Sequence, residues 1–286
     1  MHKIHLLKRG CLISLATLLL TACSSGEREA RTLLKQAETT YEQGHYQQSM
    51  ALIDSIKSRY PKAFDTRRES QQLMRKASLK EQEQNVAFLD SIIQEKQAML
   101  AEVSGQYLFE KDTVYQQLGN YIHPSQQLEK NLHRAHLSFR TNERGELTMT
   151  SIYCGKQAIH HSGVKVIAPD GTYMETPAAR ETYESTVLGE QIEKSDFRLG
   201  EDGGVMEFIY RHAEQKLKLE FKGDRSFTTN MTPADCQALV AVYNLAHLLD
   251  FIHEMQAERE ASTVKIRFIK KQIEGKMTAE EKQGEE

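Results

Sequence analysis

The residues best suited to metal or nucleophilic chemistry are histidines and cysteines in the middle of the chain. Among 11 histidines, His133 and His136 are three residues apart, and His160 and His161 are adjacent. A zinc site needs three or four ligands with supporting partners. Cys154 is a candidate third ligand, but no Cys-x-x-Cys or His-Glu-x-x-His pattern joins these residues. We therefore expect no metal and no cofactor, and treat the histidines as surface or turn residues.

Catalytic acids and nucleophiles form no stronger pattern. Glu201-Asp202 and the pair Glu190 and Glu193 would resemble glycosidase carboxylates only if they met in one cleft with unequal pKa values. Cys154 lies close to His160 in the sequence, but in a hairpin-rich region such proximity is common. The chain has no Gly-x-Ser-x-Gly nucleophile elbow. We predict that the protein is not an enzyme.

The first 22 residues have the layout of a secretory signal peptide. The start is basic, with no acid before Glu27, and residues 11–22 are almost all apolar or small. This apolar run is about 12 residues, whereas a membrane-spanning helix needs about 20. Removing residues 1–22 also removes Lys3, Lys8 and Arg9, which takes the net charge from −3 to −6. A mildly acidic mature chain without a basic stripe argues against nucleic-acid binding.

The signal peptide ends in Leu20-Thr21-Ala22-Cys23, which resembles the lipobox of bacterial lipoproteins. The resemblance implies a lipid on the Cys23 sulfur, cleavage before Cys23 and acylation of the new amino terminus. Ser24 resembles the residue that directs such proteins to the outer membrane. An ordinary signal peptide with an incidental cysteine is the alternative. We expect residues 23–29 to be a lipidated tether, with the protein in the cell envelope, periplasmic or surface-facing.

Residues 30–63 have the spacing of a helical hairpin that resembles the tetratricopeptide repeat. Serine stands where the repeat usually has alanine, and a lone hairpin must pack on another element. We expect its tyrosines Tyr41, Tyr46 and Tyr60 to pack between the helices or to contact a partner protein. The residues that carry the resemblance are Ala37, Tyr41, Gly44, Tyr46, Ser49, Ile53, Ile56 and Pro61.

Two long amphipathic helices are predicted, over residues 64–104 and 232–274. In the second, Thr232 is the expected N-cap, Pro233 the first helical residue and Asp235 the third. Each helix would be about 60 Å long. Their matched lengths favour an antiparallel coiled-coil stalk over two helices lying flat on a globular body. Residues 275–286 are polar and charged, and we expect a disordered tail there.

The middle of the chain, residues 105–231, has the two-residue period of strands. Turn signals at Asn142–Gly145 and Pro169–Gly171 predict two hairpins, and Lys216–Lys222 is the clearest strand. Val205–Arg211 is also expected to be a strand. Six to eight antiparallel strands in a sandwich or open barrel would result. This head region resembles uncharacterised exported lipoproteins of Gram-negative anaerobes, which adds a location but no mechanism.

The sequence thus predicts an α+β protein with a helical hairpin, two long helices and a central β head. We expect an envelope lipoprotein that acts as a non-enzymatic interaction or scaffold module with a protein partner. The alternative is a carbohydrate- or peptide-binding or processing protein with its site in the head. Cys154 and Cys236 could pair in an exported protein, or remain buried free thiols; the sequence leaves this open.

Overall fold

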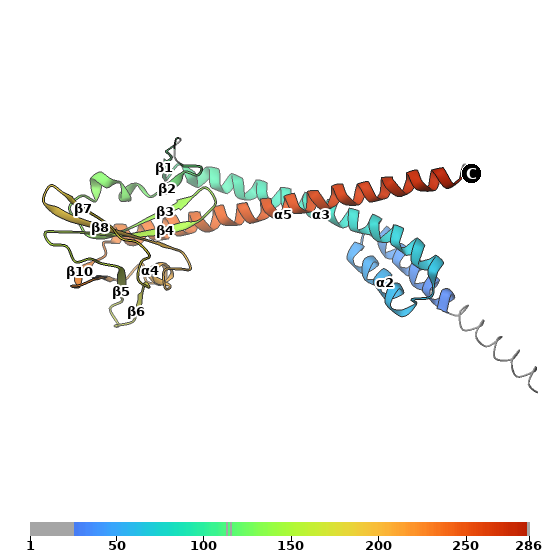
Figure 1. Ribbon diagram of the computed structural model, residues 1–286, viewed down its shortest axis with the longest axis horizontal. Coiled ribbons are helices and arrows are strands. Elements are labelled where there is room, and N and C mark those ends of the chain that lie inside the picture. Colours follow the sequence, from blue (N-terminus) through green and yellow to red (C-terminus); the bar gives the residue numbers. More distant parts are fainter. Residues whose placement is uncertain (1–25, 113, 115, 285–286) are drawn as a thin grey trace, which may run out of the picture. The chain divides into compact units, whose positions relative to one another are not determined.

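The computed structural model describes residues 26–284 except 113 and 115, so the signal peptide and Cys23 lie outside the described residues. Helices come first along the chain, then strands, then one long final helix (Figure 1). The described chain divides into two compact units, residues 26–91 with 257–284, and Ile92–Gln256. The predicted α+β fold class is confirmed, with ten strands among the described residues.

The first unit contains the predicted helical hairpin. A helix over residues 26–42 is followed by α2 (Tyr46–Arg59), and Gly44 between them has a left-handed φ of 81°. Ser49 is fully buried, and its hydroxyl donates to the carbonyl of Ala37 at 2.7 Å. This bond satisfies the hydroxyl that alanine would lack and holds the two helices together.

The hairpin packs on the first half of α3 (Phe64–Ser104), which begins and ends at the predicted residues. The amide of Gln47 donates to Glu81 at 3.0 Å, and the Thr66 hydroxyl donates to Glu27 at 2.6 Å. Hydrophobic residues of all three helices form one small cluster. It consists of buried Ala30, Leu34, Ile56 and Ala63, with Leu33, Tyr60 and Leu73 partly buried around them.

The second long helix, α5 (Pro233–Gly284), runs antiparallel to α3. In the first unit, the Asn85 amide donates to Ser262 Oγ at 3.0 Å, and Arg259 Nε donates to Asp90 at 2.5 Å. In the second unit, the Tyr107 hydroxyl donates to the carbonyl of Ala241 at 2.9 Å. In the first unit residue numbers rise along α3 as they fall along α5, so the predicted antiparallel pairing is confirmed there.

The two ends of α5 differ in how well the sequence predicts them. Asp235 N donates to Thr232 Oγ1 at 3.2 Å, and Thr232 N donates to Asp235 Oδ2 at 3.0 Å, a reciprocal cap at the predicted start. The prediction that the helix ends before Gly275 is wrong, because α5 continues to Gly284. One glycine costs about 1 kcal/mol in a helix, and the strong helix formers around it offset that cost.

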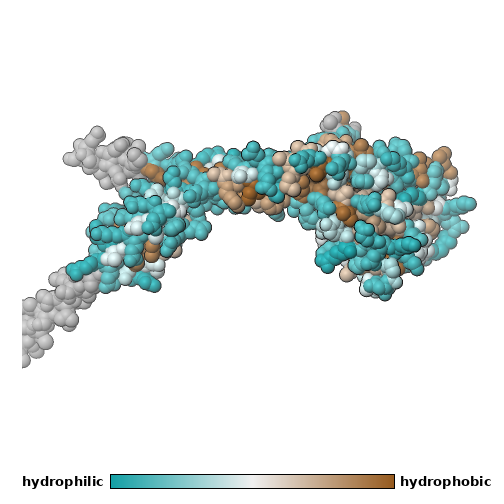
Figure 2. Space-filling view, turned by 180° about the vertical axis from the view of Figure 1, so that it is seen from behind, coloured by the Kyte–Doolittle hydropathy of each residue, from teal (hydrophilic) through white to brown (hydrophobic). Residues whose placement is uncertain are grey.

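Among the described residues, no helix is both long and apolar enough to cross a membrane. The surface of the long helices is largely hydrophilic, with scattered hydrophobic patches (Figure 2). Exposed hydrophobic side chains in the helical part of the first unit include Phe88, Val264 and Phe268.

The second unit carries two antiparallel sheets (Figure 1). A six-stranded sheet has the order β1-β2-β3-β4-β8-β7, and a four-stranded sheet has the order β10-β9-β5-β6. The strand bounds are β1 Leu108–Glu110, β2 Asn120–Ile122, β3 His136–Asn142, β4 Leu147–Gly155, β5 Gly163–Ile167, β6 Tyr173–Glu175, β7 Tyr183–Val187, β8 Glu190–Arg198, β9 Lys218–Lys222 and β10 Phe227–Asn230.

Both predicted hairpins are present, as β3–β4 and β5–β6. The expected strand over Val205–Arg211 is wrong, because these residues form the helix α4. Asp202 is buried and accepts the amide N–H of Met206 at 2.6 Å, while Gly204 takes a left-handed φ of 81° just before the helix. An acidic cap and a permissive glycine thus outweigh the strand-like composition.

One hydrophobic core joins the two sheets, α4 and the first turns of α5. The inward face of the six-stranded sheet contributes Leu137, Phe139 and Met149, and the four-stranded sheet contributes Val166 and Phe221. Because side chains alternate across a strand, the opposite face of β3, β4 and β8 points away from this core. That second face carries the candidate site.

Candidate functional site on the open face of the six-stranded sheet

Two adjoining hollows lie on the open face of the six-stranded sheet. The larger is about 580 Å³ and the smaller about 240 Å³. Ser138, Arg140, Ile152 and Lys194 line both, so the hollows form one groove. The larger hollow also has Thr150, Glu181, Thr182, Tyr183 and Asp196, and the smaller has Glu110, Ile122, Gln126, Leu128, Asn131, Leu132, His133, Arg134, His136, Cys154 and Ile192.

The larger hollow is polar. Arg140 donates to Thr150 Oγ1 at 2.9 Å and to Asp196 Oδ2 at 2.7 Å, and Thr150 donates to Asp196 Oδ1 at 2.5 Å. Strand register explains this trio, because Thr150 lies directly opposite Asp196. An ion pair exposed to this extent contributes only about 0–1 kcal/mol to stability. Its main effect is to hold the Arg140 guanidinium in one orientation across the sheet.

The smaller hollow is mostly apolar. Ile152 and Ile192 form part of its floor from neighbouring strands, and Leu128 and Leu132 are exposed on the loop beside it. This loop contains two 3-10 turns, Pro124–Gln126 and Leu128–Lys130. The Asn131 amide donates to the carbonyls of Ser125 and Gln127, both at 2.8 Å, and so holds the two turns of the loop together.

Two buried hydrogen-bond donors at the smaller hollow have no partner. Gln126 is only 6% exposed, and its Oε1 accepts the amide N–H of Phe139 at 3.1 Å. Gln126 Nε2 and Arg134 Nε are buried without a hydrogen-bond partner among the described residues. A buried donor left unpaired costs about 1–3 kcal/mol. Both atoms are enclosed by protein atoms, so this cost falls on the loop beside the hollow and not on the open surface of the groove.

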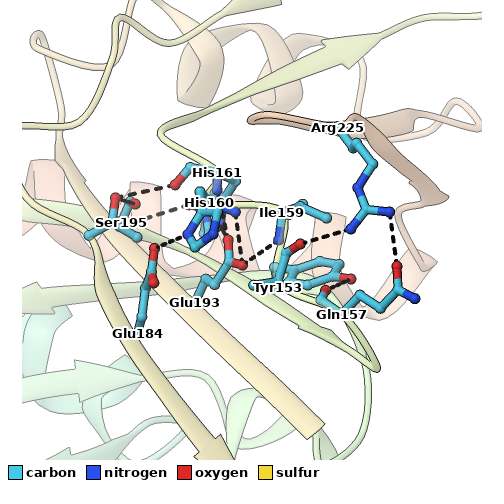
Figure 3. A network of polar contacts seen from close by, with 12 residues as sticks. Tyr153, Gln157, Ile159, His160, His161, Glu184, Glu193, Ser195 and Arg225 are labelled. Atoms are coloured by element: carbon cyan, nitrogen blue, oxygen red, sulfur yellow. Dashed lines mark hydrogen bonds and ion pairs between the residues drawn. The ribbon is translucent and has the colours of Figure 1, made fainter.

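A second polar cluster lies behind the groove, on the core side of β8 (Figure 3). The Glu193 carboxylate accepts the backbone N–H groups of Ile159 at 2.7 Å, His160 at 3.0 Å and His161 at 2.7 Å, and also contacts His161 Nδ1 at 3.0 Å. His160 has a φ of 50°, so consecutive N–H groups converge on one anion as in a backbone nest. Burial alone would raise the Glu193 pKa, but these bonds outweigh it and leave the pKa lowered.

Ser151, His161 and Glu193 have the hydrogen-bond order of a catalytic triad. Ser151 Oγ lies 2.9 Å from His161 Nε2, on the far side of the ring from Glu193. All three side chains are buried, with exposed fractions of 0%, 0% and 1%. A substrate cannot reach this serine in the folded protein, so the cluster anchors the loop before β5. Sequence spacing does not indicate this cluster, because the three residues are not adjacent in the chain.

The histidines and acids singled out from the sequence are dispersed. His133 Nδ1 contacts Glu190 Oε2 at 2.5 Å, whereas His136 is buried and contacts the carbonyl of Arg134. Glu190 and Glu193 lie on opposite faces of β8, because their positions differ by an odd number. Within the described part of the chain, no three His, Cys, Asp or Glu side chains are arranged to hold a metal ion.

The two cysteines of the described chain are both free. Burial raises the pKa of the Cys154 thiol, which also donates to Glu190 at 3.4 Å. Burial raises the pKa of Cys236 to about 11. A thiol with a raised pKa is a poor nucleophile near neutral pH.

The tyrosines predicted to contact a partner lie on the hairpin, and the structure does not bring all three together. Tyr41 and Tyr46 rings are 5.4 Å apart, while the Tyr60 hydroxyl donates to Glu29 at 3.0 Å. All three are partly buried. Tyr46 also lines an open hollow of about 480 Å³, with Gly44, His45, Gln47, Gln48, Glu81 and Gln84. Cys23 lies outside the described residues.

No protein-family model, no curated protein and no solved structure matches the chain.

Stability should fall as the pH is lowered from 7.5 to 5.5. Burial lowers the pKa of His136 and His161, so the folded protein keeps both neutral while the unfolded chain binds protons below about pH 6.5. Each of the two histidines lowers the free energy of unfolding by at most about 1.4 kcal/mol per pH unit. Urea midpoints at pH 7.5, 6.5 and 5.5 measure this fall. It should persist in His160→Gln, since His160 is exposed; equal midpoints would contradict the expectation.

Proposed function

We propose that the protein is a lipid-anchored cell-envelope protein that binds a partner through the groove of its β head, without transforming that partner. The observation that carries the binding role is the groove itself, where Arg140, Lys194 and aliphatic side chains gather on one open sheet face. The Leu20–Cys23 box supports the anchor, by its resemblance to the lipobox. A lipidated Cys23 would hold the mature chain at a membrane, with the outer membrane favoured.

The chemistry of the lining residues supports binding over catalysis. Asp196 is already paired with Arg140, so its carboxylate is not free to act as a general acid. Cys154 has a raised pKa. Such a surface recognises a ligand by fixed donors and by shape.

A processing enzyme is the second candidate, and the order Ser151–His161–Glu193 is the observation that favours it. It requires the buried serine to become accessible. A fluorophosphonate probe tests this, because the probe labels only activated serines that it can reach. Labelling that disappears in Ser151→Ala would replace the binding proposal by a hydrolase.

The hairpin provides a second proposed contact surface. Tyr46 and the hollow beside it lie on the first unit, and Tyr41 and Tyr60 belong to the same hairpin. Tyr46→Glu would place a charge there without altering the head. If Tyr46→Glu abolishes partner binding and changes in the groove do not, the binding site is on the hairpin and not in the groove.

Photo-crosslinking in cells tests the proposal directly. A crosslinking amino acid at Tyr183, which lines the groove, should give a reproducible adduct to an envelope partner after detergent extraction and mass spectrometry. Tyr173, a similarly exposed tyrosine on the four-stranded sheet, is the matched control and should give none. Cys23→Ala should leave the membrane fraction and lose the adduct. Equal adducts from Tyr173, or membrane retention of Cys23→Ala, would contradict the proposal.

A further inference from the structure

We propose that the groove binds the free carboxyl terminus of a peptide whose last residue is aliphatic. The aliphatic side chain would enter the smaller hollow, the carboxylate would lie where the hollows meet, and the preceding residues would cross the larger hollow. This inference rests on the proposed binding function and names the chemistry of the partner.

The positively charged side chains where the two hollows meet favour a negatively charged ligand. Lys194 and Arg140 line both hollows. Arg140 is tied to Asp196, but no carboxylate contacts Lys194 in the part of the chain that the structure describes. Register places Lys194 opposite Ile152 on β4 and Tyr183 on β7, in the middle of the face. A partly buried lysine without an acidic partner favours a carboxylate ligand.

The size of the smaller hollow favours one side chain over a whole molecule. Ligand pockets that bury a drug-sized molecule are about 300–1,000 Å³, and this hollow is about 240 Å³. Ile152, Ile192, Leu128 and Leu132 on its floor and rim suit an aliphatic group. A long acyl chain would exceed the space. A peptide end places an aliphatic side chain and a carboxylate on the same residue, which matches the junction.

The remaining charges restrict the ligand to one central negative group. Glu110 lines the smaller hollow and Glu181 the larger one, and both are exposed. These acids would repel a strongly acidic peptide. Charge complementarity therefore favours a single carboxylate near Lys194, preceded by neutral or basic residues.

Peptide binding to the full chain, purified in detergent, tests the inference. The probe is a fluorescent hexapeptide pool with random neutral residues and a fixed leucine at its free carboxyl end, measured by fluorescence anisotropy. Lys194→Gln should weaken binding about 10- to 100-fold, since a hydrogen bond to a charged group is lost. Lys218→Gln, the same change on the four-stranded sheet, should bind like the wild type. The same pool with an amidated end should bind as weakly as Lys194→Gln.

Three results would overturn the inference. They are equal binding of the acid and amide pools, no effect of Lys194→Gln with an unchanged melting temperature, and no binding of the acid pool. Octanoate tests a fatty acid as the alternative ligand. If octanoate binds in a way that depends on Lys194 and the peptides do not bind, the groove is a fatty-acid site. If the crosslinked adduct at Tyr183 persists in any of these cases, the groove still binds a partner. Failure of the carboxyl-terminus inference can therefore be told apart from failure of the proposed function.

Discussion

Replacing Glu193 by glutamine should lower the free energy of unfolding by about 3–5 kcal/mol, the cost of breaking a buried charged network. Glu193 is 1% exposed and accepts N–H groups from Ile159, His160 and His161. A glutamine has the same shape, but it replaces one carboxylate oxygen by an NH₂ group. The backbone N–H groups that face this NH₂ then lack an acceptor. Urea unfolding followed by circular dichroism measures the loss.

Glu184→Gln is the matched control on the neighbouring strand. Glu184 contacts His160 Nδ1 at 2.9 Å, but both side chains are about half exposed, so the pair contributes only about 0–1 kcal/mol. A loss of that small size for Glu193→Gln as well would show that the buried carboxylate is dispensable. It would also remove the argument that the nest anchors the loop before β5.

The buried carboxylate has a consequence for the groove. Glu193 stands between Ile192 and Lys194, and these neighbours face the opposite side of β8. Anchoring the inward side chain of a strand limits how far its outward side chains move. A binding site works best when a rigid support holds its residues. The nest behind β8 therefore supplies the support for the groove in front of it.

Local signals predicted the parts of the fold that depend on neighbouring residues. Thr232 and Asp235 cap α5 because a capping box needs only three consecutive positions after the cap. The turn at Asn142–Gly145 closes the β3–β4 hairpin for the same reason: Gly145 N donates to the Asn142 carbonyl at 3.0 Å. Such signals fix where elements begin and turn, whatever the rest of the chain does.

Contacts between distant residues limited what could be predicted of the site. The role of Glu193 depends on a loop 32 residues earlier in the chain, and nothing in either segment points to the other. His160 and His161 look equivalent in the sequence, yet one contacts exposed Glu184 and the other lies in the core. The conformation of the loop before β5, where His160 has a φ of 50°, decides between these environments.

The sequence carries one signal for the groove. Ile152 stands next to core Tyr153, and Ile192 next to buried Glu193, so apolar side chains lie on the face that should be polar. In an antiparallel sheet with one solvated face, such residues mark a covered or binding surface. This signal indicates a surface, although it does not indicate that Lys194 and Arg140 meet there.

The double variant Leu245→Asp with Leu249→Asp should unfold much of α5. The two leucines are 2% and 5% exposed, and they share a helix face with Ala241, whose carbonyl accepts the Tyr107 hydroxyl next to α3. Burying each charge without a partner costs several kcal/mol, beyond about 1.5–3 kcal/mol of lost burial per leucine. Circular dichroism at 222 nm and the melting temperature should both fall strongly.

The control His253→Asp with Gln256→Asp places the same charges on exposed positions of the same helix. It should cost about 1 kcal/mol or less, mainly through helix propensity. Because Leu239 and Val242 of the same helix belong to the head core, the leucine variant should destabilise the sheets together with α5. Unchanged helicity and melting in that variant would mean that α3 and α5 do not pack through this face, and the antiparallel helix pair would have to be abandoned.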